Sequence, residues 1–323
     1  MSIFFVSIYF VIQTLFAPLF ILGFFILLYK QVYKSRIIGA SSTAIAVINS
    51  RWVMDIFGLR KDTAAVNLVH KLPNTSAIGL WLIYLPSFLL YKVTGKNWFF
   101  PSCSKPGKEG LKDTIYTRTM HFDSYIEKSK NDVDQFILLG AGFDTRCYEK
   151  LSHSKLKLFE LDQEKTQNLK LQYLQSAGIE YSKITYVPVN FSSQEWTKKL
   201  LKSGYNPQKK SIFLWEGVTL YLSESDIIYT LTEIRNNSAS GSIILADFYS
   251  LSFIKGDLSP GMKSLLKLLK YTNEELKFGI DPEDFERKFE AFIVSLNLSL
   301  KSCKFMGQNT KMGSWMVVAE ILT

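Results

Sequence analysis

Short apolar runs that end in polar residues recur through this 323-residue chain after Asp113. The first, Gln135–Leu139, has the pattern of a buried strand and leads directly into Gly140. Segments with helical spacing lie between these runs, and Gln163–Ala177 is the clearest of them. Strands that alternate with helices in this way indicate βαβ units and a mostly parallel, doubly wound α/β sheet. The other expected strands are residues 155–161, 184–189, 211–215 and 241–248.

Several flanking segments complete the expected domain. Residues 113–130 are helix-like and precede the first strand. Ser223 is expected to begin a helix, with Asp226 in the position that closes a capping box. Residues 282–297 form an amphipathic helix pattern, and residues 298–305 and 314–321 are expected to form a closing antiparallel hairpin.

The residues that end the expected strands are the candidates for ligand binding, because ligands of such sheets bind at the carboxyl ends of the strands. Gly140-Ala141-Gly142 follows the first strand, but Thr145 replaces the third glycine of a dinucleotide-binding fingerprint, which argues against NAD or FAD. About 20 residues later, Glu160 and Asp162 have the spacing of acids that accept hydrogen bonds from ribose hydroxyls. The two features together favour S-adenosylmethionine, a nucleoside ligand without a diphosphate.

Four motifs make the chain recognisable. LLGAGFDTR (138–146), FELD (159–162), WEGVTLYL (215–222) and FGIDPEDF (278–285) resemble the leucine carboxyl methyltransferase family, which includes polyketide carboxyl O-methyltransferases. The resemblance runs from about residue 41 to the C-terminus and excludes the apolar N-terminus. It implies a class I S-adenosylmethionine-dependent methyltransferase fold, Rossmann-like, with an N-terminal helical lid.

The resemblance also implies roles for particular residues. Gly140 and Gly142 would line the methionine part of the cofactor, and Asp162 would bind its ribose. Arg118, in YTRTMHFD, matches an arginine that holds the cofactor's carboxylate, a task that suits the two parallel donors of a guanidinium.

Two further positions match the family's adenine and amino-group contacts. Glu216 would lie near the cofactor's amino group, and Asn190-Phe191 would lie near its adenine. The family usually has Asp where this chain has Asn190, so a charge-assisted hydrogen bond is lost, although an amide oxygen can still accept. A structural ion pair is the alternative for Arg118 and Glu216.

The expected reaction is methylation of an acceptor carboxylate to a methyl ester. A carboxylate is ionised near neutral pH and needs no general base, and the sequence has no convincing Ser/His/Asp or Cys/His set. No catalytic residue is identified, but Arg51 and Tyr221 are candidates for gripping the substrate, with packing or lid support as the alternative. Methylation of a hydroxyl group and SAM binding without catalysis remain open.

The first 29 residues contain no charged side chain. Residues 3–29 are long enough to cross a hydrocarbon core of about 30 Å, and no basic segment precedes them as in a cleaved signal peptide, the main rival interpretation. Lys30, Lys34 and Arg36 follow this stretch, so the positive-inside rule predicts a single-pass membrane protein with a cytoplasmic catalytic domain.

The positive charge is concentrated beside this apolar stretch. Residues 30–112 contain 12 Lys or Arg and 3 Asp or Glu, a net of +9, whereas the charges of residues 113–323 cancel. This division favours an anionic membrane surface over nucleic acid as the partner, with a solvated face as the alternative. The expected organisation is an anchor (1–30), a basic helical lid (31–112) and a methyltransferase domain (113–323), acting on a small or lipid-like carboxylate acceptor.

A second apolar run, Ala77–Tyr91, contains Pro86 and is short for a membrane crossing. A re-entrant, interfacial or buried helix suits it better, and a second crossing remains the alternative. The three cysteines (Cys103, Cys147 and Cys303) and three histidines (His70, His121 and His153) have neither disulfide-framework nor metal-ligand spacing, so no metal is expected.

Overall fold

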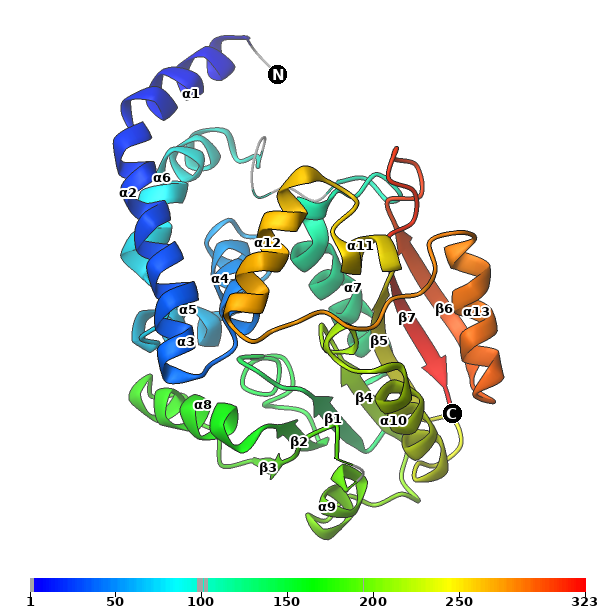
Figure 1. The fold of residues 1–323 in the computed structure, drawn as a ribbon. Helices are drawn as coiled ribbons and strands as arrows, with labels where there is room; N and C mark the ends of the chain where they lie inside the picture. The colour runs from blue at the N-terminus through cyan, green and yellow to red at the C-terminus, as the bar shows by residue number, and fades with distance from the viewer. Residues whose placement is uncertain (1–2, 98–100, 102–103, 194) are drawn as a thin grey trace.

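The structure is a computed structural model that describes residues 3–97, 101, 104–193 and 195–323. A seven-stranded sheet of order β3-β2-β1-β4-β5-β7-β6 forms its centre (Figure 1). β1 to β5 are parallel, and β7 pairs antiparallel with both β5 and β6. The strand order reverses between β1 and β4, which makes this the switch point where ligands of such sheets bind. The predicted doubly wound α/β sheet with a closing hairpin is confirmed.

All seven predicted strands are present, with bounds within two residues of those expected from the sequence. The inner strands are buried on both faces because helices cover both. Phe136 and Leu138 of β1 pack toward the helices of residues 42–71 and 114–129, whereas Ile137 and Leu139 pack toward the helices of residues 224–236 and 285–295. The strands are β1 (Gln135–Leu139), β2 (Lys157–Asp162), β3 (Ile184–Pro188), β4 (Ser211–Trp215), β5 (Ile243–Tyr249), β6 (Ser299–Met306) and β7 (Met316–Leu322).

The helices around the sheet follow local signals. Ser223 caps α10 as expected: its Oγ accepts from Asp226 N at 3.2 Å, and Asp226 Oδ2 accepts from Ser223 N at 3.3 Å. The expected helix at 282–297 begins later, because Asp284 adopts a left-handed conformation (φ 56°). These helices are α7 (Thr114–Ser129), α8 (Glu164–Ser176), α9 (Trp196–Lys202), α10 (Glu224–Asn236), α11 (Leu251–Lys255), α12 (Pro260–Tyr271) and α13 (Phe285–Ser295), with the short turns η2 (Leu111–Asp113) and η3 (Thr219–Tyr221).

The apolar N-terminus forms helices that run along one side of the domain (Figure 1). They are α1 (Ile3–Leu15), α2 (Ala17–Leu28), the π-helical η1 (Tyr29–Lys34) and α3 (Ser35–Ile38). The path bends between α1 and α2, where Pro18 occupies the first turn of α2. The helical path therefore continues past the expected end at Tyr29 and through the basic residues, until Gly39 (φ 64°) stops it.

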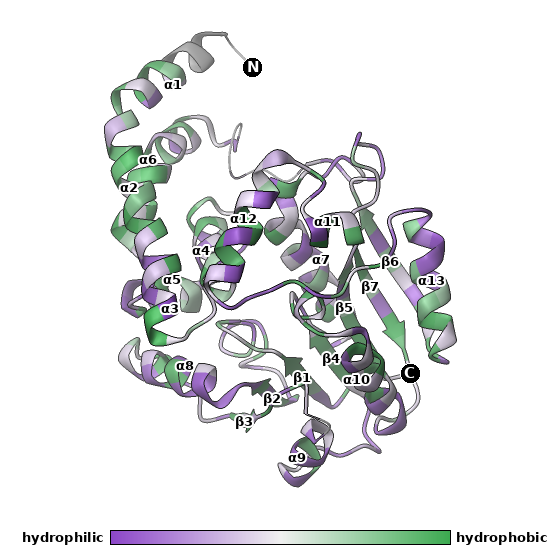
Figure 2. Ribbon diagram, viewed as in Figure 1, coloured by the Kyte–Doolittle hydropathy of each residue, from purple (hydrophilic) through white to green (hydrophobic). Residues whose placement is uncertain are grey.

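Helix α6 (Ala77–Thr94) packs antiparallel against α2, and both are strongly apolar (Figure 2). Lys30 Nζ donates to Thr75 O at 2.9 Å near one end of the pair. A Cβ added at Gly23 would lie 2.8 Å from Gly79 O, so this crossing requires a residue without a side chain. Close approach through small residues is typical of helix pairs in membranes.

The opposite side of α6 packs against the end of α4 (Ser42–Ile56), which precedes α5 (Thr63–Lys71). Trp81 contacts Trp52 with ring centroids 5.2 Å apart, and Phe57 lies among aromatic side chains farther along α6. Helix α6 is therefore held between α2 and the folded domain.

Within the part of the chain that the structure describes, two helices are long and apolar enough to cross a membrane, Ala17–Ile38 and Ala77–Thr94. Large apolar side chains are exposed along the first of them, including Leu22 (52%) and Phe25 (60%). Cys147 and Cys303 are free thiols, and Cys103 lies outside the described residues.

Candidate functional site

The turn after β1 is shaped by two glycines. Gly140 (φ 70°) and Gly142 (φ 46°) both adopt left-handed conformations. A Cβ at Gly140 would lie 2.4 Å from Val218 Cγ2, so the turn after β4 approaches here too closely for any side chain. Turns rather than a helix follow as far as residue 156, so no helix N-terminus lies here to bind a diphosphate. The result is a bare backbone surface at the switch point of the sheet.

Asp162 ends β2 and reaches across to this turn. Its Oδ2 accepts from Gly142 N at 2.5 Å and its Oδ1 from Gln163 N at 2.6 Å. Burial raises the pKa of Asp162, while these two backbone hydrogen bonds oppose the shift. Each carboxylate oxygen has a further lone pair, so the group can still accept hydrogen bonds from a diol.

The other carboxylate expected at this strand end points elsewhere. Glu160 is fully buried and accepts from Lys170 Nζ at 2.7 Å and from Tyr148 hydroxyl at 3.0 Å. It therefore forms an internal ion pair beneath α8, and the sequence-based pairing of Glu160 with Asp162 as ribose-binding acids is corrected to Asp162 alone.

Asn190 and Phe191 lie beyond the end of β3. Asn190 is exposed, and its Oδ1 accepts from Ser192 N at 3.0 Å, which stabilises the turn. This bond occupies one of the two lone pairs of Oδ1, so the other can still accept a hydrogen bond. The ring of Phe191 packs against Trp196 and Trp215, so it forms an apolar floor beside Asn190.

Arg118 projects from α7 to the ends of β4 and β5. Its Nε donates to Glu216 Oε1 at 3.1 Å, and its Nη1 donates to Asp247 Oδ2 at 3.0 Å and to Tyr249 hydroxyl at 2.7 Å. Among the described residues, Nη2 donates to no protein acceptor. One edge of the guanidinium is therefore fixed while one nitrogen remains available for an anion.

Gly217 and Asp247 support Arg118, although no role was predicted for either residue. Asp247 is fully buried and also accepts from Gly217 N at 2.8 Å. A Cβ at Gly217 (φ 69°) would lie 2.9 Å from Arg118 Nη1. The glycine in the WEGV motif could have indicated the role of Gly217. The position of Asp247 beside Arg118 could not be predicted, because it depends on which strands pair.

We expect Gly217→Ala to lower the free energy of unfolding by about 3 kcal/mol or more, because a left-handed alanine costs roughly 1–2 kcal/mol and its methyl group would also displace Arg118. Urea unfolding of the full chain in detergent measures this change. Gly178→Ala is the matched control, since Gly178 has a similar φ (65°) and no atom within 4 Å of an added Cβ. Equal losses in the two variants would contradict the contact with Arg118.

Glu216 joins two arginines at the end of β4. Its Oε2 accepts from Arg146 Nη1 at 2.6 Å, in addition to the bond from Arg118 to Oε1. Burial acts to raise the pKa of Glu216, but Arg146, Arg118 and Arg51 outweigh it and hold the pKa below its ordinary value. Glu216 is thus ionised and paired with Arg118, as expected if the two residues form a structural ion pair. Its contact with a cofactor amino group stays a prediction.

Arg51 lies inside this buried network instead of facing an open site. It is 1% exposed, and its Nη2 donates to Asp144 Oδ2 at 2.6 Å. Arg146 and Asp144 belong to the same GAGFDTR motif, and Arg146 also donates to Asp123 at 2.7 Å. The network ties α4, in the segment expected to form the lid, to the sheet. This placement favours a structural role for Arg51, and substrate gripping by Arg51 stays an untested prediction.

Tyr221 occupies η3, directly after β4, and is partly buried beside the start of α4. Burial and the carboxylate of Glu274 raise its pKa, while a hydrogen bond with Thr43 opposes the shift. The phenol is therefore neutral at physiological pH and can donate a hydrogen bond. Its position beside the strand ends is compatible with the expected contact with an acceptor.

None of the three histidines lies at a strand end: His70 is in α5, His121 in α7 and His153 in the turns before β2. Among the residues that the structure describes, no group of three His, Cys, Asp or Glu side chains could hold a metal ion.

Comparisons with known proteins match part of this chain to methyltransferases. The family model of leucine carboxyl methyltransferase matches residues 88–235. A relative from Mycolicibacterium smegmatis is 28% identical over 181 residues, which cover 51% of this chain and 56% of the relative. A relative from Mycobacterium tuberculosis is 30% identical over 146 residues, 45% of each chain. Both have S-adenosyl-L-methionine-dependent methyltransferase in their assigned names, and this chain spans about half the length of these curated relatives.

Solved structures with similar folds include a protein from Thermobifida fusca assigned as a methyltransferase. Its TM-score is 0.49 at 13% identity, with 79% of this chain and 91% of that chain covered. Magnesium protoporphyrin IX methyltransferase from Synechocystis, solved with bound SAH, has a TM-score of 0.41 at 11% identity, with 68% and 90% covered.

Proposed function

We propose that this chain transfers a methyl group from S-adenosylmethionine to an acceptor carboxylate, since the model of the leucine carboxyl methyltransferase family matches residues 88–235. The observation that supports this most directly is the hydrogen bond between Gly142 N and Asp162. It joins the bare glycine turn of β1 to an acid at the end of β2, which is the arrangement that suits a nucleoside with a small charged tail.

The residues present fit this cofactor. Asp162 has lone pairs for the ribose hydroxyls, and Gly140 excludes any side chain from the turn. Arg118 Nη2 can donate to a carboxylate while Glu216 and Asp247 keep the guanidinium in place. When bound, the cofactor supplies an electrophilic methyl group on a sulfonium. This chain's own residues position the reactants, exclude water and stabilise the anionic groups.

The choice of a carboxylate acceptor follows from the absence of a suitable base at the described strand ends. A carboxylate is already ionised near neutral pH, whereas a hydroxyl group needs a base beside the methyl group. The carboxylates described here are either paired with cations, as Glu216 is, or engaged by backbone donors, as Asp162 is. Tyr221 can donate a hydrogen bond to the acceptor from η3.

We propose further that the chain is a membrane protein with its catalytic domain in the cytoplasm. Exposed apolar side chains along α1 and α2, such as Leu15 (73%) and Phe25 (60%), support membrane association. Lys34 and Arg36 follow the apolar segment and support the cytoplasmic side under the positive-inside rule. We propose a single membrane crossing by the N-terminal helices. The proposed acceptor is a lipid-like or amphipathic carboxylate, and no nucleic acid partner is proposed.

Isotope transfer tests the reaction. Full-length protein in nanodiscs is incubated with methyl-labelled S-adenosylmethionine and a total cell extract that includes lipids. We expect labelled products that release methanol under mild alkali, which is the behaviour of methyl esters. Alkali-stable labelled ethers would instead show hydroxyl methylation, and binding of S-adenosylmethionine without labelled product would favour a non-catalytic protein. Heated protein and Asp162→Ala protein serve as controls.

A further inference from the structure

Helix α12 has two faces of opposite character. It contains no acidic residue, and Met262 and Leu269 are its buried residues. Leu265 (47%) and Leu268 (39%) are exposed although they are apolar. Exposed lysines lie along the other flank at positions 263, 267 and 270. Basic helices with exposed apolar residues are typical of segments that bind a membrane surface.

The segment after α12 covers the candidate site. Lys277 N donates to Leu220 O at 2.7 Å, so the loop that leaves α12 lies over the turn that follows β4. Within this loop, Glu274 accepts from Ser42 N at 2.9 Å and from Thr43 hydroxyl at 2.6 Å, at the start of α4. These contacts hold the C-terminal end of α12 beside α4 and next to Tyr221.

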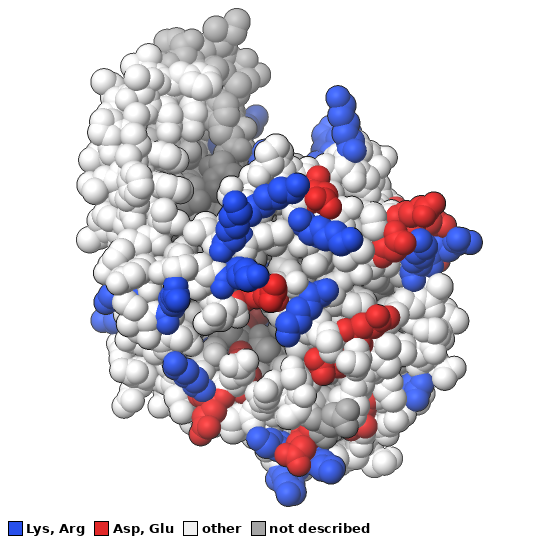
Figure 3. Space-filling model, viewed as in Figure 1, with Lys and Arg blue, Asp and Glu red and all other residues white. Residues whose placement is uncertain are grey.

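The C-terminal end of helix α12 also contacts α3, the last of the N-terminal helices. The guanidinium of Arg36, in α3, lies 4.0 Å from the ring centroid of Tyr271. Lys and Arg side chains gather over α12 on this face of the molecule (Figure 3). The positively charged surface of α12 therefore reaches α3, which continues the path of the apolar helices α1 and α2.

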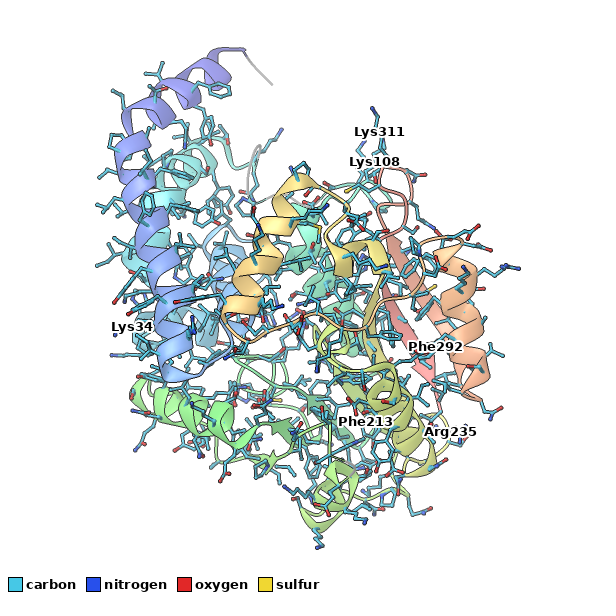
Figure 4. All side chains as sticks on the ribbon, viewed as in Figure 1. Lys34, Lys108, Phe213, Arg235, Phe292 and Lys311 are labelled. Carbon is cyan, nitrogen blue, oxygen red and sulfur yellow. The ribbon has the colours of Figure 1, made fainter. Side chains whose placement is uncertain are left out.

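A second group of lysines lies at the end of the molecule where α1 is found. Lys108 and Lys311 project together from a tip formed by two loops (Figure 4). The loops are joined by Asn309 N, which donates to Gly107 O at 2.7 Å. The carboxylate of Glu109 in this tip is buried, where it accepts from Gly307 N at 3.1 Å, so the exposed charge of the tip is positive.

The carboxyl ends of the parallel strands, where the candidate site lies, face the same end of the molecule as α1. β7 runs down to the C-terminus in Figure 1, and β5 is antiparallel to it, so β1 to β5 have their carboxyl ends toward the end with α1. A bilayer that receives α1 would then face the acceptor side of the domain.

We propose that α12 docks on an anionic phospholipid bilayer and places the entrance of the acceptor site at the lipid headgroups. This inference depends on the membrane association proposed above. It goes further by identifying the surface of the domain that contacts the lipid. The lysines of α12 contact anionic headgroups, and Leu265 and Leu268 enter the interfacial region. An amphipathic acceptor then reaches the strand ends past α12 without crossing bulk water.

Hydrogen exchange of the full-length protein in nanodiscs tests this docking. We expect amide exchange in residues 260–271 to slow by about tenfold or more when phosphatidylglycerol is added to phosphatidylcholine discs. Salt at about 0.5 M should abolish the difference, because it screens charges at the surface. The double variant Lys263→Glu, Lys267→Glu should lose the protection, since each basic residue strengthens contact with an anionic leaflet about fivefold.

The control is Lys198→Glu, Lys202→Glu, which reverses two exposed lysines of α9, at the opposite end of the molecule in Figure 1, and should keep the protection. Equal exchange of α12 in both lipid compositions, or equal protection in the two double variants, would overturn the proposal. S-adenosylmethionine binding is measured in the same discs. Wild-type binding with an unprotected α12 would refute the docking alone, whereas absent binding would refute the proposed function.

Discussion

Replacing Arg118 with lysine is expected to weaken S-adenosylmethionine binding by at least tenfold. Lysine keeps the positive charge but cannot donate to Glu216 and Asp247 while presenting a further nitrogen to the cofactor. Isothermal titration of the detergent-solubilised protein measures the affinity. We also expect a loss of roughly 2–4 kcal/mol in the free energy of unfolding, because two buried carboxylates would lose hydrogen bonds.

The two measurements separate the possible roles of Arg118. Titration is performed well below the unfolding temperature, so that a less stable variant is still folded. Arg287→Lys is the control, since Arg287 is 79% exposed and pairs with Asp284 at the surface. Lower stability with unchanged affinity would assign Arg118 to the structural network only.

Replacing Asp162 with alanine is expected to weaken S-adenosylmethionine binding by about 1–3 kcal/mol, or roughly 5- to 150-fold. The variant loses the ribose acceptor and also the bond that shapes the glycine turn at Gly142. Asp162→Asn should give an intermediate affinity, because an amide oxygen can still accept but carries no charge. Fluorescence or calorimetric titration distinguishes the two variants.

Asp132→Ala provides the control for this series, since Asp132 is exposed in the turn before β1. Its affinity should equal that of the wild type. If Asp162→Ala also bound normally, the assignment of the cofactor to this end of β1 and β2 would be refuted.

Local sequence pattern was sufficient to predict the strands of the sheet and the strand ends where the candidate site lies. The buried strands are continuous apolar runs because helices cover both faces, and such runs are visible without knowledge of their partners. The glycine turn was equally visible, because Gly140 and Gly142 hold backbone conformations that other residues avoid. The cap at Ser223 needs only the four residues that form it.

Side-chain roles that depend on distant contacts could not be predicted in the same way. Glu160 and Asp162 have the same parity in one strand, yet Lys170 from α8 engages the first and the glycine turn engages the second. Arg51 was a candidate either for gripping the substrate or for packing, and only the folded chain shows that Asp144, 93 residues away in sequence, pairs with it in the interior. Ionic partners of this kind are determined by which helices pack together.

The sequence by itself determined the order of the main strands and helices along the chain, the glycine turn and the apolar N-terminus, because each depends on residues close together in the chain. The tertiary structure decided that Asp247 and Gly217 hold Arg118, that α6 lies between α2 and α4, and that α12 lies beside the N-terminal helices. The physical reason is that buried charges require partners and apolar faces require cover, and only the folded chain shows which distant residues supply them.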